Sequence, residues 1–145
     1  MCSSGTMMGM YRVALYTSCA LALLLYVLNR IALTYHLFWR LWWYDIPMHL
    51  VGGMVLGAGF VWFFGSLQER KPLRSDFLTI VSILGAVFIG GVVWEVYEYV
   101  FDLNYNPLLD YVVDTVKDMS MDMLGAVATL WFYKKRRASV VHGHG

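Results

Sequence analysis

The chain has 145 residues, of which 59% are hydrophobic and only 14% are charged. This length fits one domain, and the composition, with a mean hydropathy of +0.57, excludes an ordinary soluble domain and indicates a membrane protein. A net charge of +1, without a basic stripe interleaved with aromatic residues, argues against nucleic acid as a partner. Cys2 and Cys19 show neither a disulfide framework nor the spacing of metal ligands.

The first half of the chain predicts two membrane-spanning helices. A flexible cytoplasmic segment is expected at residues 1–11, followed by an apolar helix over about residues 12–38. An aromatic cluster at residues 38–44 is typical of the level of lipid headgroups. The second helix is expected over residues 45–67, because an aspartate followed by a proline suits the first turn of a helix. Both apolar segments are long enough to cross a bilayer.

The second half predicts two further spans. The third is expected over about residues 77–101, and the fourth from about Pro107 to Arg137, before a flexible cytoplasmic tail at residues 138–145. The expected fold is therefore all-α: a polytopic membrane protein whose residues 12–137 form a bundle of four transmembrane helices. Four spans place both termini on the same side of the membrane.

The positions of the basic residues predict which side that is. Eight of the eleven Lys and Arg residues fall on the side of the termini. The three on the opposite side are Arg30, Arg40 and Lys117. Because cytoplasmic loops carry an excess of Lys and Arg, we expect a multi-pass protein of the cell membrane with both termini in the cytoplasm.

Polar residues recur at one depth of the four predicted helices. At about 1.5 Å per residue, Arg30, His49 and Glu95 each lie roughly 27 Å from the cytoplasmic ends of their helices. Asp118 and Asp122 lie roughly 24 and 18 Å from the cytoplasmic end of theirs. An acid within a membrane helix normally faces the bundle interior and has a partner. The sequence therefore predicts one polar layer in the outer third of the membrane.

The helix faces support the same prediction. Residues that are four apart share one face of a helix, and three such faces combine acids with small residues. They are Asp45, His49, Gly53 and Gly57; Gly91, Glu95, Glu98 and Asp102; and Asp114, Asp118, Asp122, Gly125 and Ala126. Small residues allow membrane helices to approach closely, so we expect the polar faces to meet above a floor of glycines.

Several carboxylates with one imidazole in a low dielectric require compensating cations or protons. A divalent metal such as Zn, Mn, Fe or Mg is the leading hypothesis, and Arg30 is expected to neutralise one acid. Lys117 would neutralise another acid if it turns inward, and otherwise it extends toward the headgroups. If the protein is an enzyme of a lipid-linked or envelope substrate, Glu98 or Asp114 would be the catalytic base. The expected metal ligands are Asp45, His49, Glu95, Glu98, Asp118 and Asp122.

Two alternative functions stay open. The same acids could serve as a relay in a proton- or cation-coupled transporter, or the protein could be a non-catalytic, lipid-binding accessory subunit. Taken singly, Asp45 could be only a helix cap and His49 only an interfacial histidine. Expected partners are membrane lipids and a second copy of the chain, which could pack through pairs of small residues such as Gly53 with Gly57.

The three acidic segments together resemble a known family. The motifs are Asp45-x-x-x-His49 with Gly52-Gly53, then Trp94-Glu95-x-x-Glu98, then Asp114-Thr115-x-x-Asp118-x-x-x-Asp122-x-x-Gly125-Ala126. In this pattern the second to fourth spans resemble the YjdF-like membrane proteins of bacteria and archaea, and distantly the VanZ-like proteins. The resemblance implies a polytopic helical protein with a functional acidic patch, and it implies no particular chemistry.

Overall fold

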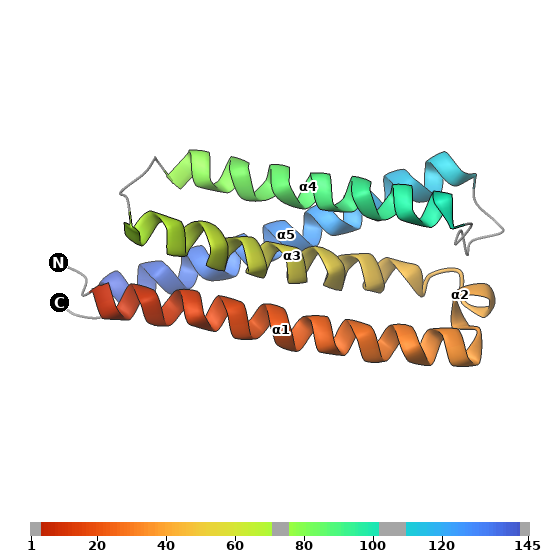
Figure 1. Ribbon diagram of the computed structural model, residues 1–145, viewed down its shortest axis with the longest axis horizontal. Coiled ribbons are helices and arrows are strands. Elements are labelled where there is room, and N and C mark those ends of the chain that lie inside the picture. The colour runs from red at the N-terminus through yellow and green to blue at the C-terminus, as the bar shows by residue number, and fades with distance from the viewer. Residues whose placement is uncertain (1–3, 71–75, 102–109, 143–145) are drawn as a thin grey trace.

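The computed structural model describes residues 4–70, 76–101 and 110–142, and within these residues it contains helices and no strand. Four long helices lie side by side as a bundle, and one short helix connects the first two of them (Figure 1). The expectation of an all-α bundle is confirmed for this part of the chain. The helices are α1 (Ser4–Tyr35), α2 (Leu37–Arg40), α3 (Asp45–Arg70), α4 (Asp76–Val100) and α5 (Tyr111–His142).

Two helices extend into segments that were expected to be flexible. Helix α1 begins at Ser4 rather than at Arg12, and α5 continues past Arg137 to His142. Neither extension contains a proline, and a glycine inside a helix costs only about 1 kcal/mol, so nothing in the sequence stops these helices earlier. The expected start of the last helix near Pro107, and the position of Asp102, lie outside the described residues.

The turn after α1 sets the position of the polar layer. His36 has φ 54° and ψ 40°, the left-handed conformation that commonly ends a helix. The chain then forms α2, which buries Phe38, while the Tyr44 hydroxyl donates a hydrogen bond to the Leu28 carbonyl at 3.2 Å. These contacts fix the start of α3 beside the last turns of α1.

Helix α3 is the centre of the bundle, because it packs against α1, α4 and α5. Its contact with α5 is a backbone crossing: a Cβ on Gly53 would overlap the backbone of Asp122, and a Cβ on Gly125 would overlap the backbone of Leu50 and Met54. Glycine is required at both positions because no side-chain movement relieves a clash with backbone. The expected glycine floor is thus confirmed at the α3–α5 crossing.

Within the described residues, three helices are long and apolar enough to cross a membrane: Met8–Tyr35, Asp45–Leu67 and Phe77–Val100. Many large apolar side chains on these helices face outward, including Leu23, Ile89 and Val93, each more than 60% exposed. Such a surface suits lipid rather than water. Helix α5 does not qualify, because its apolar stretch is interrupted by Asp118 and Asp122.

Candidate functional site

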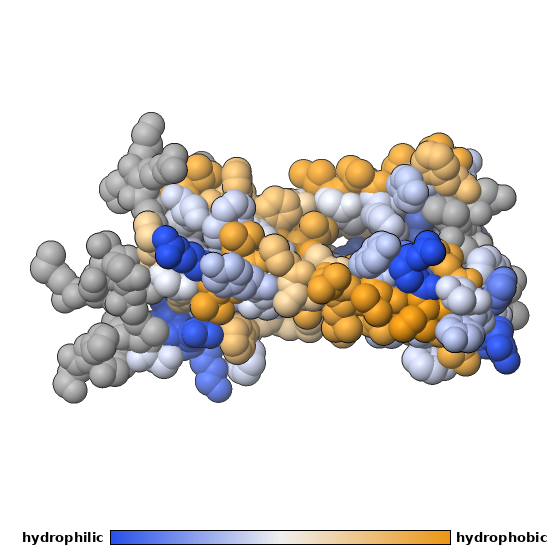
Figure 2. Space-filling view, turned by 60° about the horizontal axis from the view of Figure 1, so that its bottom comes forward, coloured by the Kyte–Doolittle hydropathy of each residue, from blue (hydrophilic) through white to orange (hydrophobic). Residues whose placement is uncertain are grey.

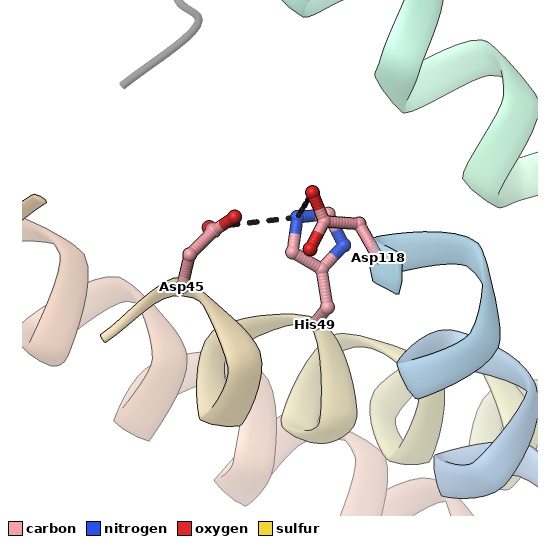
Figure 3. A group of neighbouring side chains, drawn as sticks. All are labelled: Asp45, His49 and Asp118. Carbon is pink, nitrogen blue, oxygen red and sulfur yellow. Dashed lines mark ion pairs between the residues drawn. The ribbon is translucent and has the colours of Figure 1, made fainter. Parts of the chain in front are cut away.

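A cluster of acids around His49 lies at the start of α3, at the end of the bundle opposite the first residue of α1 and the last residues of α5 (Figure 1). Helix α3 contributes Asp45 and His49, which are one helical turn apart, and α5 contributes Asp118 from the facing side (Figure 3). His49 and Asp118 are buried and Asp45 is half-buried. The expected convergence of acids from separate helices is therefore confirmed.

Both ring nitrogens of His49 face carboxylates. Nε2 lies 3.6 Å from Asp45 Oδ1 and 3.8 Å from Asp118 Oδ2, and Nδ1 lies 3.5 Å from Asp122 Oδ2. These separations are longer than ordinary hydrogen bonds. They resemble the distance of about 3.4 Å between two ligands of one tetrahedral ion with bonds of about 2.1 Å. The imidazole is thus held among three carboxylates from two helices.

Lys117 is the cation of the cluster, and it turns inward rather than toward the headgroups. Its Nζ donates a hydrogen bond to Asp114 Oδ1 and lies 3.2 Å from Asp118 Oδ1 and 3.7 Å from Asp45 Oδ2. Arg30, which was expected to neutralise an acid, is exposed on α1 and makes no ion pair within the described part of the chain. The structure does not bring Arg30 to the cluster. Lys117 makes the ion pairs with the acids that were expected of Arg30.

Helix α4 contributes Glu95 and Glu98. Glu95 is only 6% exposed, and its Oε2 accepts a hydrogen bond of 2.8 Å from the Thr115 hydroxyl on α5. Its other oxygen, Oε1, is buried without a hydrogen-bond partner among the described residues. A buried polar atom without a hydrogen-bond partner lowers the stability of the fold. The position of Glu95 Oε1 therefore requires a physical reason.

The donor atoms of the cluster form two overlapping groups of metal-ligand type. One comprises Asp45, His49 and Asp118, and the other comprises His49, Glu95 and Glu98; in each group, one ligand atom per residue lies within 4.8 Å of the others. Two ligands on opposite sides of an ion with bonds of about 2.1 Å are about 4.2 Å apart. Each group could therefore bind one ion after small side-chain movements.

Asp122 lies at the bottom of the cluster, in a space kept open by glycines. A Cβ on Gly91 would come within 3.0 Å of Asp122 Oδ2, and one on Gly52 within 3.5 Å of Asp122 Oδ1. Helices α3, α4 and α5 all approach this carboxylate. At the same level, the α3–α5 crossing brings the backbone of Gly53 against the backbone of Asp122.

A cavity of about 670 Å³ adjoins the cluster. Asp45, His49, Glu98 and Asp122 line one part of it, and apolar residues of α1, α3 and α4 line the rest. Helices α1 and α4 each pack on α3 and are not packed against each other along their lengths. Figure 2 shows the surface hollowed in the half of the molecule that carries the start of α3. The cluster is thus reached from the side of the bundle.

Sequence reasoning missed the role of Thr115 and gave the inward position of Lys117 only as an alternative. Thr115 holds Glu95, and its position twenty residues later on another helix gives no local signal of that contact. The sequence favours the inward position of Lys117, because Lys117 directly precedes Asp118 and lies three residues after Asp114. Asp114, an expected base, is buried and bonded to Lys117, which makes it less suited to accept a proton from a substrate.

Fold and site together define a helical membrane protein with three candidate spans and a buried cluster of acids around one histidine. The chain belongs to a family described as predicted membrane protein (DUF2238), whose family model matches residues 10–139. No curated protein and no solved structure was found to match the chain.

Proposed function

We propose that the chain crosses the cell membrane four times, with α5 as the fourth span and both termini in the cytoplasm. The first residue of α1 and the last residues of α5 lie at the same end of the bundle (Figure 1). The acids that interrupt the apolar stretch of α5, Asp114, Asp118 and Asp122, are all buried against the other helices. A membrane helix tolerates acids that face the bundle interior, so their number does not argue against this span.

Within that frame, the function that the geometry supports best is binding of a divalent metal by His49, Glu95 and Glu98. The observation that carries this proposal is Glu95 Oε1, a buried carboxylate oxygen without a hydrogen-bond partner among the described residues, on a residue that belongs to a group of metal-ligand type. A metal ion would satisfy that oxygen. Imidazole and carboxylate ligands suit Zn, Mn and Fe, and carboxylates alone suit Mg.

The group that contains Glu95 is a better candidate than the group that contains Asp45 and Asp118. Lys117 Nζ already lies within 4 Å of both of those aspartates, and a second cation beside it would be repelled. No ion pair of a lysine or arginine with Glu95 or Glu98 is found among the described residues. Asp45, Asp118 and Asp122 would then orient His49 from outside the metal shell, as carboxylates often do for metal-bound histidines.

A metal in this position could support hydrolysis or group transfer on a lipid-linked substrate. Such an ion polarises a phosphoryl or acyl oxygen or activates water. Glu98 is half-buried and lines the cavity, so it could bind the ion or act as a base. The motif segments that resemble YjdF-like proteins supply the members of this cluster, which is in keeping with a functional acidic patch.

Elemental analysis of the purified full chain tests the metal. After incubation with Zn, Mn, Fe or Mg salts and removal of free ions, we expect about one ion per chain. Glu95→Gln should remove it, because the substitution keeps the size of the side chain and loses the charge. Asp110→Asn is the matched control, since Asp110 is an exposed acid at the same end of the bundle and outside the cluster. A chain that retains no metal, or a Glu95→Gln variant that retains it, would remove the proposal.

A proton relay is the second candidate, because His49 bridges the half-buried Asp45 and the buried Asp122. This alternative predicts pH-driven flux in liposomes that Asp122→Asn abolishes. The backbone crossing at Gly53 and Gly125 closes the space between α3 and α5 at the level of Asp122. The metal is therefore the better supported of the two.

A further inference from the structure

The cavity beside the cluster is polar at one end and apolar at the other. Along α3 its lining begins at Asp45 and His49 and ends at Val55 and Leu56. At about 1.5 Å per residue, Asp45 and Leu56 lie roughly 16 Å apart along the helix. On α4, Glu98 lines the cavity near the same outer end, and Gly90 lines it deeper. Its polarity thus changes in one direction, from the proposed outer surface toward the middle of the membrane.

The charge of the polar end of the cavity determines whether it attracts a cationic or an anionic ligand. Among the described residues that line the cavity there are three acids and no lysine or arginine. The three acids are Asp45, Glu98 and Asp122, while Glu95 and Asp118 belong to the same cluster without lining the cavity. No lysine or arginine among the described lining residues offsets these acids within the cavity. An anionic headgroup would be repelled, whereas a cationic one would be attracted.

Aromatic rings line the cavity near the acids. Trp94 and Tyr97 on α4 have ring centroids 5.4 Å apart, and Tyr26 and Phe38 line the cavity from α1 and α2. Aromatic faces attract ammonium groups, and quaternary ammonium ligands are often bound between such rings and carboxylates. Acids and rings together are thus the side chains that recognise an alkylammonium group.

We propose that this cavity binds a membrane lipid with an ammonium headgroup, such as a zwitterionic phospholipid, with the ammonium group at Asp45 and Glu98 and a chain along Val55 and Leu56. The lipid enters sideways between α1 and α4, in the orientation of a lipid of the outer leaflet. This inference rests on the proposed membrane orientation. It applies to the metal-free chain, because a divalent ion held by Glu98 would repel an ammonium group at the same carboxylate.

Native mass spectrometry of the full chain in detergent tests the proposal. Phosphatidylethanolamine and phosphatidylglycerol with identical acyl chains are titrated separately, and the apparent Kd of the first lipid bound is compared. We expect phosphatidylethanolamine to bind roughly tenfold more tightly, as one charge-assisted contact would give. Glu98→Gln should remove most of this preference, and Asp110→Asn should keep it. Ala22→Trp, which fills the apolar end of the cavity from α1, should weaken the binding of both lipids.

The same variants distinguish the lipid proposal from the metal proposal. Glu95 does not line the cavity, so Glu95→Gln should lose metal and keep the lipid preference, and Ala22→Trp should do the reverse. Equal binding of the two lipids, or tighter binding of phosphatidylglycerol, overturns the proposal, as does an unchanged preference in Glu98→Gln. Displacement of the lipid by tetramethylammonium chloride, beyond that by equal sodium chloride, would show that a free cation rather than a lipid is the ligand.

Discussion

The backbone carbonyl of Asp122 occupies the place that a Cβ on Gly53 would take. This contact joins the floor of the bundle to its polar cluster, because the same Asp122 presents its carboxylate to His49 at 3.5 Å. The distance between α3 and α5 at this crossing therefore sets how far the acids of α5 lie from the imidazole. The glycines act on the site by positioning the helices.

Gly53→Ala is accordingly expected to destabilise the bundle and to loosen the cluster. Forcing one methyl group into a closely packed contact typically costs 1–3 kcal/mol, which for a chain of this size corresponds to a fall in Tm of roughly 3–10 °C. The unfolding of the detergent-purified protein, followed by circular dichroism, measures this. Gly85→Ala is the control, because a Cβ on Gly85 meets nothing within 4 Å. Equal Tm values for the two variants would contradict the close crossing.

The crossing and the cluster could be predicted from the sequence because both depend on short-range regularities. Acids and glycines that are four residues apart share a helix face, and helix rise places three such faces at one depth. The direction of the Arg30 side chain could not be predicted in the same way. Arg30 lies on a helix that packs mainly on α3, so the direction of its side chain depends on how α1 is rotated, which its nearly uniform apolar sequence does not specify.

Lys117→Gln is expected to destabilise the protein, because it leaves Asp45, Asp114 and Asp118 without their shared cation. Loss of one partner of a buried ion pair costs on the order of 3 kcal/mol. Asp118→Asn in the same chain should restore part of this stability, since it removes one of the charges left unpaired. The free energy of unfolding in a denaturant series measures the single and double variants.

Arg30→Gln is the matched control for this prediction. Arg30 is exposed on α1 and takes no part in the ion pairs of the cluster, so its substitution should change stability by less than about 0.5 kcal/mol. A loss as large as that of Lys117→Gln would mean that Arg30, and not Lys117, compensates the acids.

Thr115→Val tests whether the hydrogen bond to Glu95 prepares that carboxylate for a metal. The Thr115 hydroxyl holds Glu95 Oε2 at 2.8 Å, which leaves Oε1 free to bind an ion. Loss of such an outer contact typically lowers metal affinity 10- to 100-fold. Competition with a chelator of known affinity measures the change. Ser120→Ala should leave the affinity unaltered, because the Ser120 hydroxyl donates its hydrogen bond to the Val116 carbonyl on the exposed side of α5.

The topology prediction depends on α5. If α5 spans the membrane, reporter enzymes fused to the N-terminus and to the C-terminus will both be cytoplasmic. If only the three apolar helices span it, the two reporters will lie on opposite sides. A phosphatase that is active only outside the cytoplasm and a fluorescent protein that matures only inside it distinguish these results in whole cells. A chain truncated after α4 is the control, since its three spans should place the C-terminal reporter outside. An active phosphatase at the end of the full chain would contradict a transmembrane α5, and with it the outward-facing position of the acidic cluster.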